Sequence, residues 1–347
     1  MTHHLLRRIG LSMSLLGTAI AGTALLGSAY AASAALTQGT VLAAKQPLGR
    51  TVRSTPRLNV LTSGTQTYTY TLLSFPGSLS TEGVGISPGS GGMGSQVVGA
   101  WNIGNSQTGF RASVWGKDVV TESYKLLNDP AGPVPQQAYS INDFGKIVGD
   151  YIDASGIFHG YETDGGTFKP IEVPFASAAG TYSPAISNAG VISGGWFDSA
   201  GNSHGFTLVQ GVYTPFDYPG APYTDPYAIN SEGDIAGYYV DTAGSIHGFL
   251  RRRGVYTSVD YPGAVETFSL GINDAGAIVG GYCLTSQCET TGQGQQGFLL
   301  KNGVYTSVAI PGEFGTALQS INNQGVLLGS YTDAAGSFYT FLATPTP

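Results

Sequence analysis

The stretch INSEGDIAGYY at residues 229–239 decides the fold of this chain. It is followed by Asp241-Thr-Ala-Gly244, by His247-Gly-Phe-Leu250, by Gly254-Val-Tyr-Thr257 and by Asp260-Tyr-Pro-Gly263, before the next Ile-Asn pair opens at 272. A unit of about 43 residues built from such short runs cannot bury its own apolar face, so it must stack on neighbouring units. The repeat therefore predicts the architecture before any single residue is considered.

The same unit recurs along the chain. Its Ile-Asn anchors stand at Ile141-Asn142, Ile186-Ser187, Ile229-Asn230, Ile272-Asn273 and Ile321-Asn322, and a worn copy begins at Ile86-Ser87. A threonine five residues before the anchor recurs as Thr81, Thr181, Thr224, Thr267 and Thr316, whereas the unit at 141 has Gln136 there.

One unit is divided between the two ends of the domain. The last copy stops after Phe341-Leu342, and its missing Tyr-Thr-x-x-x-x-Pro-Gly portion stands at the other end as residues 70–77. A linear solenoid has no reason to split a repeat, but a closed ring does, because strands from both ends then pair and no sheet edge stays open.

Each unit contains four strand-like runs of β-branched and aromatic residues, separated by Asn/Asp-x-x-Gly turns. Six units of four strands predict an all-β, six-bladed β-propeller of four-stranded blades, closed by an N-terminal strand that pairs with the C-terminal partial repeat. A β-sandwich and a β-helix are the alternatives, and the split repeat argues against both.

The N-terminus has the features of an export signal. Arg7 and Arg8 precede an apolar stretch, and Ala29-Tyr30-Ala31 resembles a cleavage site. We expect a signal peptide at 1–31, a disordered leader or linker at 32–66 and a single propeller domain at 67–347. The apolar stretch is also long enough for an uncleaved membrane anchor.

Charge and cysteine content narrow the function. The chain has a formal net charge of −7, and the expected signal peptide holds two arginines and no acid, so the mature chain is still more acidic. This excludes a typical nucleic-acid binder. Cys283 and Cys288 are the only cysteines, and in an exported protein they predict a disulfide.

Three histidines occupy one slot of the repeat and are predicted to be structural. His159, His204 and His247 each precede Gly-Phe or Gly-Tyr, and equivalent slots in a ring lie far apart, so they cannot converge on one metal. Their expected partners are the hairpin aspartates Asp153, Asp198 and Asp241, while Asp333 keeps the turn without a histidine. We expect no metal and no cofactor.

Residues that differ between repeats are the candidates for function. No nucleophile elbow, phosphate-binding loop or dinucleotide fingerprint occurs. The segment leading into each innermost strand should frame the mouth of a central channel, where polar and aromatic side chains can hold a ligand. The candidate ligand-binding residues are Glu82, Gln136, Tyr223, Asp225, Glu266 and Glu313, with Gln137 and Phe314 beside them; ordinary exposed loop residues are the alternative.

The residue pattern of the repeat resembles that of a known protein family. The segments GINDAGAIVGGY (271–282), DTAGSIHGFL (241–250) and VDYPGA (259–264) are similar to the HAF-repeat extracellular proteins of bacteria. The resemblance covers about residues 68–347, and His-Gly-Phe replaces the His-Ala-Phe core of the family. It implies a secreted or surface-exposed repeat domain and brings no catalytic residues.

The sequence therefore favours a secreted, periplasmic or cell-surface binding module, which we expect to be monomeric and free of the membrane after signal cleavage. Its partner would be a carbohydrate or a cell-envelope protein. A polysaccharide lyase or glycosidase is the main alternative and needs two carboxyl groups about 5–10 Å apart. A passive cell-surface spacer is the third.

Overall fold

A computed structural model gives the architecture of the chain. It describes residues 58–60, 66–73, 80–89, 95–103, 106–115, 118–119, 125–127, 136–153, 155–175, 180–285, 288, 293–334 and 337–346. The predicted signal peptide lies outside the described residues, as does most of the predicted leader. Within the described residues no helix is long and apolar enough to cross a lipid bilayer.

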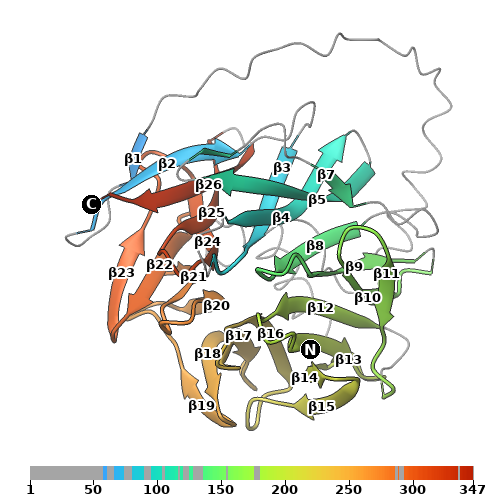
Figure 1. The fold of residues 1–347 in the computed structure, drawn as a ribbon. Helices are drawn as coiled ribbons and strands as arrows, with labels where there is room; N and C mark the ends of the chain where they lie inside the picture. The colour runs from blue at the N-terminus through green and yellow to red at the C-terminus, as the bar shows by residue number, and fades with distance from the viewer. Residues whose placement is uncertain are drawn as a thin grey trace, which may run out of the picture.

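Six strands in the described part of the chain surround a common centre (Figure 1). Each of them contacts the next, and the last contacts the first, which closes a ring. Each begins a blade, and the blades are named here after these innermost strands. They are β3 (Ser80–Ile86), β8 (Gln136–Ile141), β12 (Thr181–Ile186), β16 (Tyr223–Ile229), β20 (Glu266–Ile272) and β24 (Gly315–Ile321).

The remaining strands pair outward in antiparallel order. The second strands are β4 (Gln96–Ile103), β9 (Ile147–Ile152), β13 (Ile192–Phe197), β17 (Ile235–Val240), β21 (Ile278–Cys283) and β25 (Leu327–Thr332). The third are β5 (Ser106–Trp115), β10 (Phe158–Thr163), β14 (Ser203–Val209), β18 (Ile246–Arg252), β22 (Gln296–Lys301) and β26 (Phe338–Pro345). The outer ones are β7 (Lys125–Leu127), β11 (Phe168–Ile171), β15 (Val212–Phe216), β19 (Val255–Ser258), β23 (Val304–Val308) and β2 (Tyr68–Leu73), and β6 (Asp118–Val119) also pairs with β5.

The two ends of the domain complete one blade, as the split repeat predicts. β2 runs antiparallel to β26, with Tyr70 opposite Ala343 and Leu72 opposite Phe341. β1 (Leu58–Val60) adds a strand outside β2, so the sheet begins earlier than the sequence predicts. A three-residue strand is too short to show a periodic pattern within the polar leader. The β-propeller prediction is confirmed.

Repeated residues explain why each unit folds in the same way. The recurrent threonine of the innermost strand accepts the backbone N–H that ends the preceding unit: Thr267 Oγ1 lies 3.0 Å from Tyr261 N, and Thr224 Oγ1 lies 2.9 Å from Tyr218 N. The glycine of Ile-Val-Gly lets the first two strands approach closely, because a Cβ on Gly280 would overlap the carbonyl oxygen of Phe268.

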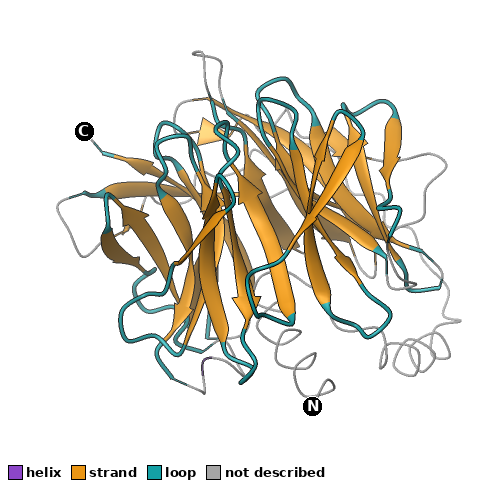
Figure 2. Ribbon diagram, turned by 90° about the horizontal axis from the view of Figure 1, so that it is seen from below, coloured by secondary structure: helices purple, strands orange, loops and turns teal. Residues whose placement is uncertain are grey.

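Aromatic side chains then pack the blades against one another. The third-strand phenylalanines are fully buried, among them Phe206, Phe249 and Phe298. The tyrosine of the Asp-Tyr-Pro-Gly turn reaches the following blade, where Tyr261 stacks on Tyr282 with ring centroids 3.6 Å apart. Turned by 90°, the molecule shows its loops gathered at the two faces of the ring (Figure 2). The face where the innermost strands end carries the candidate site.

Candidate functional site

The anchor asparagines connect neighbouring blades at this face. Asn273 Oδ1 accepts the N–H of Ala277 at 3.0 Å, which closes the turn between β20 and β21. Its Nδ2 donates to the carbonyl oxygen of Asn322 in the next blade at 3.1 Å. Asn230 repeats both contacts, with Asp234 N and with the carbonyl oxygen of Asn273. One side chain thus shapes a turn and joins two blades, which accounts for the Ile-Asn signature.

The residues after these asparagines form a second set of links. Asp274 Oδ1 accepts the N–H of Ser231 at 2.8 Å, and its Oδ2 accepts a hydrogen bond from Asn323 Nδ2 at 2.7 Å. On the other side of the ring, Asp143 and Asn188 bond in the same way across two blades. These contacts hold the strand ends in a fixed frame around the channel.

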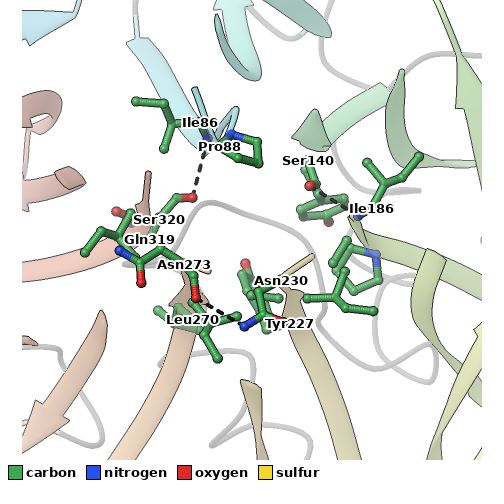
Figure 3. Close-up of a pocket in the computed structure, with 18 of the residues that line it drawn as sticks. Ile86, Pro88, Ser140, Ile186, Tyr227, Asn230, Leu270, Asn273, Gln319 and Ser320 are labelled. Atoms are coloured by element: carbon green, nitrogen blue, oxygen red, sulfur yellow. Dashed lines mark hydrogen bonds between the residues drawn. The ribbon is translucent and has the colours of Figure 1, made fainter. Parts of the chain in front are cut away.

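A small cavity lies inside this frame (Figure 3). Its volume of about 50 Å³ leaves room for a few water molecules or a group of similar size. All six blades contribute to its wall, and Asp274 is the single charged residue among those that line it. The six anchor isoleucines all belong to the apolar wall: Ile86, Ile141, Ile186, Ile229, Ile272 and Ile321.

The deeper wall is formed by the residues two positions before the anchor isoleucines, which differ from blade to blade. Three of them are polar, namely Tyr139, Tyr227 and Gln319. Gln319 is 1% exposed, and its Nε2 donates to Ser330 Oγ at 2.7 Å. Its Oε1 has no hydrogen-bond partner among the described residues. An acceptor left without a donor at a buried site is costly unless water or a ligand supplies one.

Three carboxyl groups are buried between the blades close to these tyrosines. Burial raises the pKa of Glu82 to about 8 and that of Asp150 to about 8, the latter in spite of a hydrogen bond from Tyr139. Burial also raises the pKa of Asp225 to about 7, against the opposing effect of Tyr238 and Tyr182. At neutral pH, Glu82 and Asp150 are therefore largely protonated when nothing compensates their charge, and Asp225 is about half protonated.

The three carboxyl groups raise the pKa of the same two phenols, Tyr139 and Tyr227. Burial raises the pKa of Tyr139, and the charges of Asp150, Glu82 and Asp225 raise it further. The pKa of Tyr227 is raised for the same reasons, by burial first and then by these three acids. The phenols of two residues that line the cavity therefore lie within electrostatic reach of all three carboxyl groups.

Four of the six predicted ligand-binding residues lie buried between the blades and not at an open channel mouth. Glu82, Tyr223, Asp225 and Glu266 are each at most 3% exposed, because the first residues of the innermost strands pack between blades. Glu313 is half-buried, and the side chain of Gln136 lies outside the described residues. None of the other five residues, whose side chains the structure describes, lines the cavity described above. Their role in binding stays a prediction.

Sequence reasoning missed Asp150, Tyr139, Tyr227 and Gln319. Asp150 stands on a second strand, β9, where the other repeats carry Ala100, Gly195, Tyr238, Gly281 and Ser330 opposite the same position of the first strand. A comparison of repeats over all four strands, rather than over the segment before the anchor alone, would have found it.

The histidines lie away from this cavity and each contacts two carboxylates. Nε2 of His204 lies 3.4 Å from Asp198 Oδ2, the hairpin aspartate of its own repeat, and its Nδ1 lies 3.0 Å from Asp217 Oδ1. Trp196 stacks on the imidazole ring. His159 and His247 repeat this arrangement, with Asp153 and Glu172 and with Asp241 and Asp260. In the last blade Tyr339 donates to Asp333 instead.

The two cysteines are joined by a disulfide, as predicted. Cys283 ends β21 and its side chain is buried. Across the part of the chain that the structure describes, no three His, Cys, Asp or Glu side chains gather in a way that could hold a metal ion.

Strand pairing and ring closure define the class: this is a β-propeller. A scan against protein-family models and a search of curated protein sequences find no match. Solved structures do match. TolB from Acinetobacter baumannii gives a TM-score of 0.47 at 13% identity, over 72% of this chain and 63% of that one.

Two further matches are of the same kind. A putative TolB from Agrobacterium tumefaciens gives a TM-score of 0.48 at 13% identity, over 84% of this chain and 92% of that one. A fungal lectin from Aleuria aurantia, described as a six-bladed β-propeller with a novel fucose recognition mode, gives 0.45 at 10% identity, over 76% and 93%. These likenesses concern the fold alone.

Proposed function

We propose that this protein is a binding module that works outside the cytoplasm and takes its ligand at the channel end framed by the anchor asparagines. The observation that carries the proposal is the cavity that all six blades line, with a buried acceptor, Gln319 Oε1, left without a partner among the described residues. The packing of the repeats does not account for a buried acceptor at a position that differs from blade to blade, whereas a ligand that donates a hydrogen bond does.

The place of action is supported by the disulfide and by the predicted signal. A disulfide between Cys283 and Cys288 persists in oxidising compartments such as the periplasm or the extracellular space. The N-terminal Arg7, Arg8 and Ala29-Tyr30-Ala31 pattern predicts export to such a compartment. Membership of the HAF-repeat proteins, which the repeat wording suggests, would agree with this location and stays a prediction.

The size of the cavity limits what can enter. About 50 Å³ accepts one small group, so a larger ligand would insert a single group and lie across the face with the rest. Glu82, Asp225 and Glu266 are buried, so a polysaccharide chain cannot reach them without rearrangement of the blades. Their burial therefore argues against glycoside chemistry at these carboxyl groups.

The test is a thermal-shift screen of the full exported chain against small polar ligands. A ligand of the folded state raises the melting temperature by mass action. The shift should vanish in Ala228→Leu, which fills the cavity, and should persist in Ala189→Leu, an exposed turn position at the same face. The melting temperature of each variant without ligand checks folding. A shift that survives Ala228→Leu would place the ligand elsewhere.

A further inference from the structure

The polar groups in and around the cavity are unbalanced toward acceptors. Gln319 lines the cavity, and three buried oxygen atoms, Gln319 Oε1, Glu82 Oε1 and Asp150 Oδ2, have no hydrogen-bond partner among the described residues. The single charge in the wall is the carboxylate of Asp274. A group that fills this site must therefore bring hydrogen-bond donors.

No protein cation serves this purpose in the described structure. The residues that line the cavity include no lysine, arginine or histidine. Near this face, Lys146 lies 3.1 Å from Glu162 and Arg252 Nε lies 2.8 Å from Asp234, while the Arg111 guanidinium lies beside Gly145 and Gly165 and does not line the cavity. The compensating charge would thus come from outside the chain.

The phenols connect the cavity to the buried carboxyl groups. Tyr139 and Tyr227 line the cavity, and both hydroxyls feel Glu82, Asp150 and Asp225. A hydroxyl can accept a hydrogen bond from a ligand while it donates to a carboxylate. A positive charge in the cavity would therefore be stabilised by three acids from three blades, in a setting of low dielectric constant.

We propose that the channel cavity binds a primary ammonium group, with Gln319 Oε1 and the Tyr139 and Tyr227 hydroxyls as acceptors and with Glu82, Asp150 and Asp225 compensating its charge. This inference rests on the proposed function and names the ligand class of the same site. A cavity of about 50 Å³ matches the head of such a group and excludes a bulky cation.

Binding of this kind is coupled to proton release. While the cavity holds no cation, Glu82 and Asp150 are largely protonated at neutral pH because their pKa lies near 8. An ammonium group favours the carboxylate form, so a carboxyl O–H bond breaks and the proton passes to the buffer. A neutral ligand of the same shape gives no such release.

The experiment compares matched ligands by calorimetry on the full exported chain at pH 7, in phosphate and in HEPES. Propylamine is compared with 1-propanol, and glucosamine with glucose, so that free amines and amino sugars are separate arms. We expect the amine to bind at least tenfold more tightly than its neutral counterpart in one arm, and the apparent enthalpy to depend on the buffer because protons are released.

The variants decide between outcomes. Glu82→Gln should weaken amine binding about tenfold and reduce proton release, and Gln319→Leu should weaken binding without removing the release. Glu162→Gln, a surface pair partner of Lys146, is the matched control and should change neither. Equal binding of amine and neutral ligand, or binding without proton release, overturns this inference while the binding module stands. If no ligand in the screen gives a shift that depends on the cavity, the proposed function fails as well.

Discussion

The rim of the propeller and its channel treat ionisable groups in opposite ways. At the rim, His204 contacts Asp198 and Asp217 through its two ring nitrogens, and two other blades repeat the arrangement. Around the channel, between the blades, Glu82 and Asp150 each bury a carboxyl oxygen that has no partner among the described residues. The histidines and aspartates of the rim are regularly paired, whereas Glu82 and Asp150 occur once each and carry unmet hydrogen bonds.

This difference distinguishes residues that recur in the same position of each repeat from residues that occur once. A residue that recurs in the same slot has the same local partners in each blade, so its role is explained inside one unit and its neighbour. A residue that occurs once has no such explanation. Burial adds a second difference, since rim pairs are screened by solvent and channel groups are not. The following predictions test whether the energies follow this division.

The largest effect is expected from the buried latch at the channel end. Asn273→Ala removes the acceptor of Ala277 N and the donor to the Asn322 carbonyl, and leaves both backbone groups buried. The Ala277 N–H is then unsatisfied, which costs about 1–3 kcal/mol, and the Asn322 carbonyl keeps the Gly325 N–H but loses a hydrogen bond worth about 0.5–1.5 kcal/mol, so the free energy of unfolding should fall by about 2–4 kcal/mol in denaturant titrations.

The control is the same substitution at the rim. Asn202→Ala removes a contact with Asp198 at a half-buried turn and should cost less than about 1 kcal/mol. Equal losses at the two positions would show that the channel end is not the more strongly held region.

Glu82→Gln is expected to stabilise the protein and to alter its pH dependence. The unfolded carboxyl group ionises near pH 4.3, whereas the folded one keeps its proton up to about pH 8. Between these values only the folded state holds the proton, so stability falls as pH rises, by up to about 1.4 kcal/mol per pH unit. The neutral amide lacks this loss, so the variant should be more stable by on the order of 2 kcal/mol at pH 7.

Denaturant titrations from pH 4 to pH 9 measure this effect. The two proteins should have similar stability at pH 4 and should diverge as the pH rises. Glu172→Gln, at the rim beside His159, is the matched change of an acid to an amide and should shift stability by less than about 1 kcal/mol. Parallel curves for Glu82→Gln and the unaltered protein would mean that Glu82 is ionised in the folded state.

The ring was predictable from the sequence because it depends on repeated residues. The Ile-Asn anchors, the recurrent threonines and the divided repeat are visible as letters, and they lead directly to the β2–β26 pairing. The disulfide was predictable from two cysteines in an exported chain. The strand β1 was not, because three residues give no periodicity.

The site was less predictable because burial is a property of the assembled ring. The sequence shows that Glu82 and Asp225 differ between repeats. It does not show that they are enclosed between blades, because that depends on partners more than forty residues away, such as Tyr182 for Asp225. Gln319 and Tyr227 belong to strands whose pattern alone suggests core packing. The second carboxylate on each histidine, thirteen residues further along the chain, was also missed.

The smallest effect on stability is expected at the rim histidines. There the charged form of the side chain stabilises the fold, whereas at Glu82 the charged form destabilises it. Burial lowers the pKa of His159, but hydrogen bonds to Glu172 and Asp153 outweigh this and leave the pKa raised. Its contribution is therefore fully present below about pH 6.5, the value of the unfolded side chain, and is lost as pH rises through the raised folded value. Because the ring is partly exposed, His159→Gln should cost less than about 1 kcal/mol at pH 5.5 and nothing measurable from charge at pH 9.

Tyr339→Gln, in the slot that carries a phenol, should cost the same at both pH values, since no imidazole charge is involved. A loss at His159 that is larger at pH 9 than at pH 5.5 would show that the neutral ring, and not its pairing with two carboxylates, holds this turn.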